Sequence, residues 1–181
     1  MGQRLARPVL QKTLAVGADE LILLEDETFD SFDSYFTACV LATAIKKVGN
    51  YNLILCGREA ADSDAGQVGP GIAEILGIPC VAFAQNVKIS DGKVRVERVI
   101  TDGYLDGYEV IEAPTPALVT ASNEVGELRS ATVMALLEAR KKAVIIWNAQ
   151  ELELDSSLPR ERASMLRLFI PVLALSRVLP D

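Results

Sequence analysis

The sequence contains no histidine among its 181 residues. This absence excludes Ser-His-Asp and Cys-His nucleophile systems, His-Glu-x-x-His zinc sites and any imidazole general base. Cysteine is scarce as well: Cys39, Cys56 and Cys80 lie far apart and form no Cys-x-x-Cys motif. We therefore expect buried, reduced thiols, and neither a disulfide framework nor a metal site. A stand-alone enzyme would have few catalytic groups, so we expect a protein without a catalytic centre of its own.

Long apolar runs and an excess of basic charge are also missing. The longest apolar stretch, Leu168–Leu175, contains Pro171 and is far shorter than the ~20 residues of a membrane-spanning helix. No basic segment precedes an apolar one at the N-terminus, so we expect no secretory signal and a cytoplasmic protein, or a mitochondrial matrix protein in a eukaryote. The formal net charge of -7 argues against nucleic acid or an anionic membrane as the partner. Backbone amides would have to supply many of the contacts to any bound phosphate.

The hydrophobic pattern predicts an α/β fold: a Rossmann-like parallel sheet with helices on both faces, plus a β-ribbon. We expect the α/β domain to span residues 1–149, and residues 150–181 to form a C-terminal arm that contacts a partner. The alternation of Val81–Ile100 around Ser90-Asp91-Gly92 predicts a hairpin, which the ribbon continues over residues 103–112. Helices are expected over residues 1–16, over 67–76 with a stop at Gly77, and over 129–142. A further helix is expected between an N-cap at Asp33 or Ser34 and a stop at Gly49, and strands are expected over 21–24, 52–56, 117–121 and 143–147. In the helix over residues 129–142, Val133, Leu136 and Leu137 are expected to face inward.

The loop Gly57–Pro70 is the strongest candidate for a ligand site. It follows a buried strand and precedes a helix, at the carboxyl end of the sheet where ligands of open α/β folds bind. Its small residues allow close backbone approach, and free amides at the helix start can hold an anion. Asp62 and Asp64 would repel a phosphate unless they cap amides or face away. A capped loop without a ligand explains the spacing equally well, because neither GxGxxG nor GK[ST] is present.

Three blocks of sequence match one family in order. Gly57–Pro70 fits G-[RK]-Q-A-x-D-x-D-x-x-Q-[VT]-G-P, and Ser122–Thr132 fits S-N-E-x-G-E-P-R-Y-x-T, with A-[RK]-K-K following at Ala139–Lys142. Ala15–Asp19 fits A-M-G-A-D. Over nearly its whole length the chain therefore resembles the β subunit of electron transfer flavoprotein, whose fold is like that of the adenine nucleotide alpha hydrolases.

The resemblance implies a subunit that works in a heterodimer. In that family an α subunit carries most of the redox-active FAD on a mobile domain. The pair passes electrons from flavin dehydrogenases, such as the acyl-CoA dehydrogenase of fatty acid oxidation, to a membrane quinone reductase. The β subunit buries AMP, or a second FAD in the electron-bifurcating branch. Carried over by motif, the nucleotide contacts are Ala60, Ser63, Gly66, Gln67 and Val68, with Asp62 and Asp64 shaping the loop.

The same resemblance implies a docking surface for the dehydrogenase. It maps to Ser122–Thr132, with contacts at Asn123, Glu124, Glu127 and Arg129, and to an apolar anchor at Val133. Core packing explains Val133 equally well, and a solvated charge at a helix start explains Arg129. The chain departs from the family pattern at four positions: Glu59 for Gln, Leu128 for Pro, Ser130 for Tyr, and Val99 for a residue that is commonly acidic. The departure at Val99 puts in doubt a charge contact to the mobile flavin domain.

The start of the chain departs further. Met1-Gly2 aligns with a family Met-Gly-Pro that follows an early strand, so we expect roughly the first quarter of the family's length to be absent. That part supplies a parallel strand and part of the adenine pocket, and its absence predicts an unpaired strand edge. A shortened gene start is one explanation; the other is a degenerate relative that fills the gap differently, for example as a homo-oligomer.

One alternative function stays open at this point. A free-standing nucleotide-binding regulator of universal-stress-like fold would need no α subunit. It would leave the Ser122–Thr132 block without a purpose, which argues against it.

Overall fold

The computed structural model describes residues 1–30, 33–61, 64–101, 106–155 and 158. Asp62, Ser63 and most of the expected C-terminal arm lie outside these residues. The helical elements are α1 (Arg7–Leu10), α2 (Lys12–Ala15), η1 (Glu27–Phe29), α3 (Ser34–Val48), α4 (Val68–Leu76), η2 (Asn123–Val125) and α5 (Val133–Ala139). The strands are β1 (Ile22–Leu24), β2 (Leu53–Gly57), β3 (Cys80–Ser90), β4 (Lys93–Thr101), β5 (Asp106–Pro114), β6 (Ala117–Ala121) and β7 (Ile145–Trp147).

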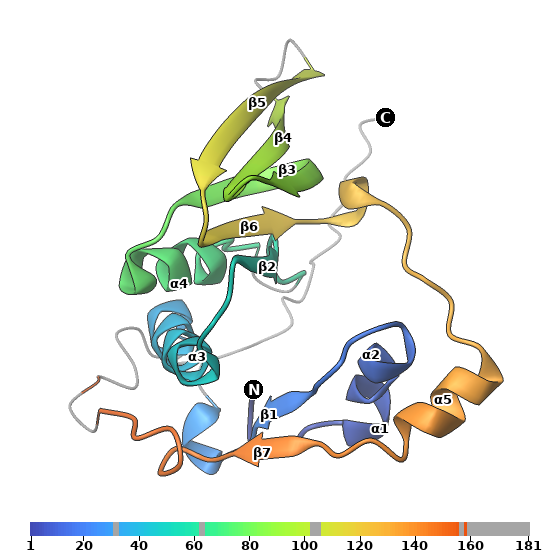
Figure 1. The fold of residues 1–181 in the computed structure, drawn as a ribbon. Coiled ribbons are helices and arrows are strands. Elements are labelled where there is room, and N and C mark those ends of the chain that lie inside the picture. Colours follow the sequence, from blue (N-terminus) through green and yellow to red (C-terminus); the bar gives the residue numbers. More distant parts are fainter. Residues whose placement is uncertain (31–32, 62–63, 102–105, 156–157, 159–181) are drawn as a thin grey trace, which may run out of the picture.

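The described strands form two sheets, which Figure 1 shows one above the other. The larger has the order β2-β6-β3-β4-β5, and the smaller pairs β1 with β7. The β2-β6, β6-β3 and β1-β7 pairs are parallel, and β3-β4-β5 is antiparallel. The α/β, Rossmann-like fold class is confirmed, as is the hairpin between β3 and β4. Strand β1 pairs with β7, whereas β2 pairs with β6, so β1 and β2 lie in different sheets although they are consecutive strands of the chain.

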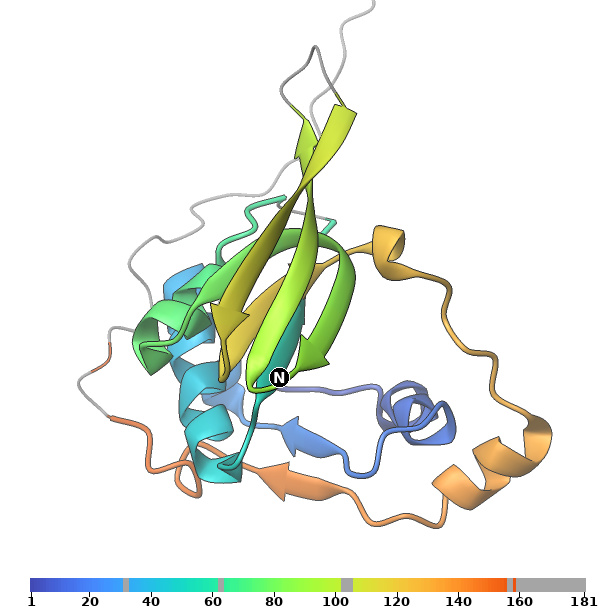
Figure 2. The ribbon, with the colours of Figure 1, turned by 45° about the horizontal axis from the view of Figure 1, so that its top comes forward.

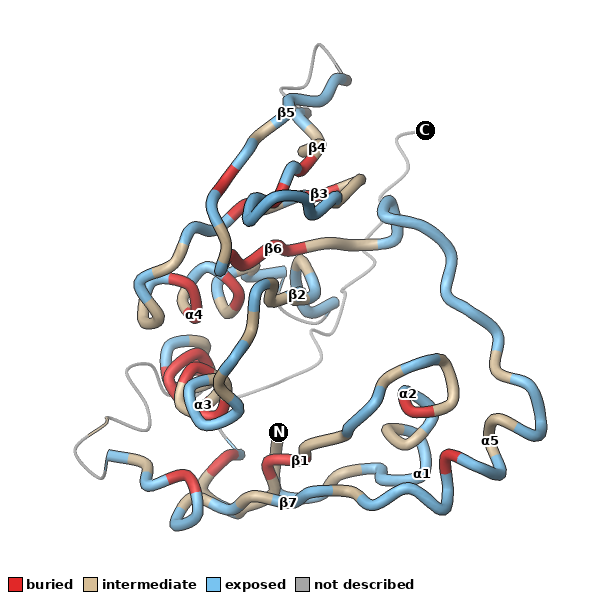
Figure 3. Tube along the Cα trace, in the orientation of Figure 1, coloured by how far each residue is buried: buried red, intermediate tan, exposed pale blue. Residues whose placement is uncertain are grey.

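Helices α3 and α4 pack together beside the larger sheet (Figures 1 and 3). Asp33 begins α3 because its carboxylate accepts hydrogen bonds from the amides of Tyr35 and Phe36. Gly77 ends α4 in the left-handed conformation, which glycine adopts without strain. Between the helices and the sheet lies a buried cluster of small and branched residues: Ala38, Ala42, Ile72, Ala73 and Leu118. This packing fixes where α4 begins relative to β2 and β6.

The opposite face of the larger sheet carries a second core. There β3, β4 and β5 curl over β6, and their outer ends project from the body of the protein (Figure 2). The enclosed residues are Val81, Ala84, Val94, Val96, Ala113, Ala117 and Val119. A third core, around Phe29, Phe36 and Val40, joins α3 to the smaller sheet. Among the described residues, no helix combines the length and the apolar character needed to cross a membrane.

The structure corrects several sequence-based predictions. The first predicted helix is two short ones, α1 and α2. Helix α5 begins at Val133 rather than at residue 129, because Thr132 caps it through the amide of Ala135. Val133 and Leu137 are 73% and 47% exposed, so the prediction that they face inward is wrong; Ala139 is the buried residue of this helix. Cys39 is buried as expected, whereas Cys80 is exposed.

Candidate functional site

The N-terminus of α4 presents backbone amides that no side chain of its N-cap residue satisfies. Gln67 occupies the N-cap position in a right-handed conformation and makes no side-chain capping bond. Its Oε1 instead accepts a hydrogen bond of 2.8 Å from Ser34 Oγ at the start of α3. A helix start without a side-chain cap retains donors for an anion, and the helix dipole favours negative charge there.

Close packing of α4 against β6 explains a glycine of the motif. A Cβ atom at Gly69 would lie 2.7 Å from Thr120 Cγ2, a distance that real Cβ atoms do not show. Gly66 has a φ of +59° and lies beside the carbonyl of Arg58, so the loop doubles back over its own start. Glycine at both positions lets the loop and the helix start approach the strand ends closely.

The predicted nucleotide residues follow this loop in order. Asp64 has a φ of +47°, and its amide donates to the Ala60 carbonyl at 2.8 Å, which makes a turn at that point. Gly66, Gln67 and Val68 then lead into α4, with Gly66 and Val68 half-buried. The roles of Asp62 and Ser63 fall outside the described residues. Asp64 and residues 66–68 thus lie on the stretch that leads from the end of β2 to the start of α4.

The predicted docking residues lie on an exposed connection. Asn123 and Glu124 are in η2, and Glu127 and Arg129 follow on the extended segment that runs from the larger sheet to α5 (Figures 1 and 3). Large apolar side chains next to them are also exposed: Leu128 by 87%, Val133 by 73% and Met134 by 67%. Exposed apolar side chains grouped in this way are typical of protein–protein contact surfaces.

The far end of this connection is fixed by contacts that the sequence did not reveal. Gly17, with a φ of +124°, has the guanidinium of Arg129 beside it, at 3.7 Å from the position of a Cβ atom. Lys142 Nζ donates to the Ala18 carbonyl at 3.2 Å. Two cations therefore lie beside the turn that follows α2. Arg129 of the Ser122–Thr132 block and Lys142 thus both contact the Ala15–Asp19 block, which gives Arg129 a structural contact beside its predicted docking role.

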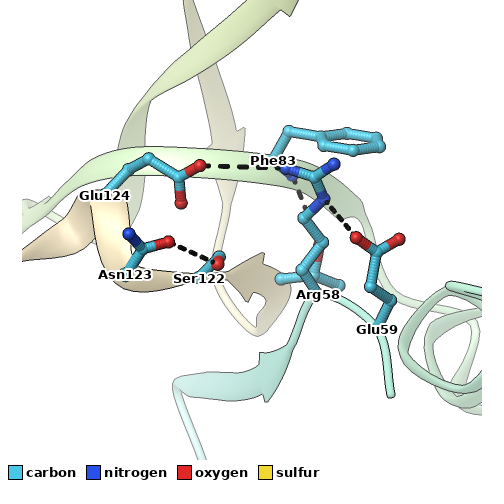
Figure 4. Close-up of polar contacts among 7 residues, drawn as sticks. Arg58, Glu59, Phe83, Ser122, Asn123 and Glu124 are labelled. Carbon is cyan, nitrogen blue, oxygen red and sulfur yellow. Dashed lines mark hydrogen bonds and ion pairs between the residues drawn. The ribbon is translucent and has the colours of Figure 1, made fainter. Parts of the chain in front are cut away.

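The near end of the connection meets the Gly57–Pro70 loop at Arg58 (Figure 4). The Arg58 amide donates to the Ala121 carbonyl at 2.8 Å, and its guanidinium carbon lies 4.5 Å from the centre of the Phe83 ring. Its Nε is 3.3 Å from Glu59 Oε1 and its Nη1 is 3.8 Å from Glu124 Oε1. A cleft of about 530 Å³ opens beside this cluster and is lined by Arg58, Phe83, Arg98, Val99, Ile100 and Glu109.

The thiols near the site are held in their neutral form. Burial raises the pKa of the Cys56 thiol, and the nearby Cys80 raises it further. Cys80 is exposed as a residue, but partial desolvation of its thiol still raises its pKa. A raised pKa lowers the thiolate fraction at neutral pH and with it the reactivity of a cysteine. Across the described part of the chain, no three acidic or cysteine side chains come together as a metal ion would require.

Comparison with known proteins shows to which family the chain belongs. The electron transfer flavoprotein domain matches residues 1–152. The chain is 43% identical over 158 residues to the "Electron transfer flavoprotein subunit beta" of Thermoanaerobacterium thermosaccharolyticum, covering 87% of this chain and 59% of that protein. It is 38% identical over 169 residues to the "Caffeyl-CoA reductase-Etf complex subunit CarD" of Acetobacterium woodii, covering 93% of this chain and 63% of that protein.

A third relative is the "Acryloyl-CoA reductase electron transfer subunit gamma" of Anaerotignum propionicum, which is 35% identical over 156 residues, covering 84% of this chain and 57% of that protein. This chain therefore spans about three fifths of the length of the relatives it matches. With a domain match over residues 1–152 and these relatives, the chain belongs to the electron transfer flavoprotein β-subunit family.

Proposed function

We propose that this chain binds an adenine nucleotide at the Gly57–Pro70 loop and the start of α4, as one subunit of a two-subunit electron carrier. The observation that carries the proposal is the α4 N-terminus, which lacks a side-chain cap and approaches β6 so closely that position 69 has no room for a Cβ atom. Membership of an electron-transfer family supports the same conclusion.

The residues present suit a phosphate group. The chain has a net charge of -7, so a phosphate is best held by neutral donors, and backbone amides at a helix start are such donors. Exposure of Ala60, Asp64 and Gln67 leaves the loop accessible to a ligand. AMP at this site would have a structural role only, whereas FAD would add a second redox-active flavin. The proposal concerns the adenylate phosphate group, which AMP and FAD share.

The proposed partners follow from the exposed connection. An α subunit would carry the redox-active FAD, and a flavin dehydrogenase such as an acyl-CoA dehydrogenase would dock on Ser122–Thr132 with Val133 as its apolar anchor. The exposure of Leu128, Val133 and Met134 supports a protein contact at this surface. In this assembly the chain binds and orients its partners in the cytoplasm, while electrons pass through flavins. We propose no catalytic group of its own.

Equilibrium dialysis with AMP and with FAD tests the nucleotide site, using two matched glycine variants. Gly66 and Gly92 both have a positive φ, of +59° and +71°, and neither has an atom close enough to clash with a Cβ. Alanine therefore strains the backbone similarly at each position, but only Gly66→Ala changes the proposed phosphate loop. We expect Gly66→Ala to weaken nucleotide binding about tenfold or more and Gly92→Ala to leave it unchanged. Equal affinities for the two variants, or no binding by the parent chain, would overturn the proposal.

A further inference from the structure

Arg58 belongs to both halves of the site. Its backbone begins the nucleotide loop and is bonded to the end of β6 through Ala121, the last residue before the docking segment Ser122–Thr132. Its side chain reaches Glu124 of that segment (Figure 4). We propose that Arg58 is a positioning residue that ties the docking segment to the nucleotide loop, so that nucleotide and protein partner bind cooperatively. This inference rests on the proposed function and adds a coupling between its two sites.

Phe83, whose ring packs against the Arg58 guanidinium, has a strained backbone conformation. Phe83 has a φ of +64°, a conformation that bulky side chains rarely adopt. The register of β3 against β6 shifts between Val81 and Ala84, and a bulge of this kind redirects a side chain. The Phe83 amide donates to Thr120 Oγ1 at 3.3 Å. Strain of this sort persists where surrounding contacts hold it and clusters at functional positions.

Thr120 connects Phe83 to the proposed phosphate site. Its Oγ1 accepts from Phe83, and its Cγ2 is the atom against which α4 packs at Gly69. Thr120 is 2% exposed, so it transmits a displacement rather than absorbing it. A continuous set of contacts therefore runs from the start of α4 through Thr120 and Phe83 to the guanidinium, and from there to the docking segment.

The guanidinium is incompletely bonded in this arrangement. Arg58 Nε is shielded from solvent and has no hydrogen-bond partner among the described residues, although Glu59 is 3.3 Å away. The 3.8 Å contact to Glu124 is longer than a hydrogen bond. A ligand bound to the loop restrains Arg58 further and reduces the conformational freedom that the contact to Glu124 must overcome. Ordering that one ligand has already imposed favours the second, which gives positive cooperativity.

The expected coupling is modest. Arg58 and Glu124 side chains are 34% and 39% exposed, and ion pairs of such exposure stabilise weakly. Together with the exposed cation–π contact, this predicts a coupling of about two- to five-fold in affinity. Reciprocity requires the same factor for nucleotide and for protein partner.

Hydrogen–deuterium exchange on the full chain tests the proposed coupling between the loop and the docking segment through Arg58, and it needs no protein partner. Amide exchange over residues 122–128 is measured with and without saturating AMP, in the parent chain and in two variants. Arg58→Met keeps an unbranched side chain and removes the guanidinium, with its charge and its contact to the Phe83 ring. Arg95→Met is the matched control, because Arg95 lies on β4 and has no salt bridge among the described residues. We expect AMP to slow exchange about two- to five-fold in the parent chain and in Arg95→Met, and to have no effect in Arg58→Met.

Two results would overturn the inference. One is binding of AMP to the parent chain with no change in exchange over residues 122–128. The other is the same AMP-dependent protection in Arg58→Met as in the parent chain. A failure of AMP to bind the parent chain in dialysis refutes the proposed function itself, so the two failures are told apart.

Discussion

Replacing Gly69 by alanine tests whether the start of α4 is positioned by contact with β6. The new Cβ would lie 2.7 Å from Thr120 Cγ2, about 0.7 Å short of ordinary contact at 3.4 Å. Overpacking of this kind costs about 1–3 kcal/mol, and the better helix propensity of alanine returns about 1 kcal/mol. We therefore expect Gly69→Ala to lower the free energy of unfolding by about 1 kcal/mol. We also expect weaker nucleotide binding, because the helix start moves away from the loop.

The matched change is Thr120→Ser, which removes Cγ2 and keeps the Oγ1 that accepts from Phe83. Alone it costs about 1 kcal/mol through the lost methyl group. In Gly69→Ala/Thr120→Ser the new methyl fills that space, so we expect a favourable coupling energy of at least about 1 kcal/mol and recovery of nucleotide affinity. Urea unfolding followed by circular dichroism, with calorimetry for binding, measures both. Strictly additive effects of the two substitutions would refute the argument from packing.

Three further predictions concern docking, pH and helix capping. Val133→Asp should leave the free energy of unfolding within about 0.5 kcal/mol of the parent, because the side chain is exposed, and should weaken association with the dehydrogenase. Val9 on α1 is also exposed, and Val9→Asp should not weaken that association. A pull-down measures the association, and thermal unfolding measures the stability. The pKa values of Cys56 and Cys80 are raised in the folded chain, so the unfolded chain releases the thiol protons first as pH rises. The free energy of unfolding should therefore fall as pH rises past the ordinary thiol pKa near 9, and should fall less in the serine variants. Urea titrations from pH 7 to 10 measure this dependence. Asp33→Ala removes the cap of α3 and should cost about 1 kcal/mol, and Asp33→Asn should cost much less; a cost equal for both would show that charge rather than capping matters.

Local signals predicted much of the fold. The stop at Gly77 lies where the sequence placed it, and of the two N-cap candidates, Asp33 and Ser34, the structure has Asp33; capping is predictable to this extent because it depends on a few neighbouring residues. The same holds for the turn between β3 and β4. The division into two sheets could not be predicted, because the parallel pairing of β1 with β7 joins residues more than a hundred positions apart.

The site was predicted in part. Motif spacing pointed to Gly57–Pro70 and Ser122–Thr132, whose binding roles stay predictions. It did not reveal the contact of Arg58 with Glu124, which depends on how β2 and β6 lie side by side. The helix expected from residue 129 begins later, since Thr132 supplies the cap and the Arg129 guanidinium lies beside Gly17. Apolar spacing pointed Val133 inward, but spacing cannot distinguish a core face from a face that awaits a partner.

The central claim is that the Gly57–Pro70 loop and the start of α4 hold an adenine nucleotide. The most direct measurement is to heat-denature the purified protein, after incubation with AMP and FAD and removal of the excess, and to identify what is released by mass and absorbance. The account predicts close to one adenine nucleotide per chain, with far less from Gly66→Ala than from Gly92→Ala. Absence of nucleotide from the parent chain, or equal amounts from the two variants, would contradict it.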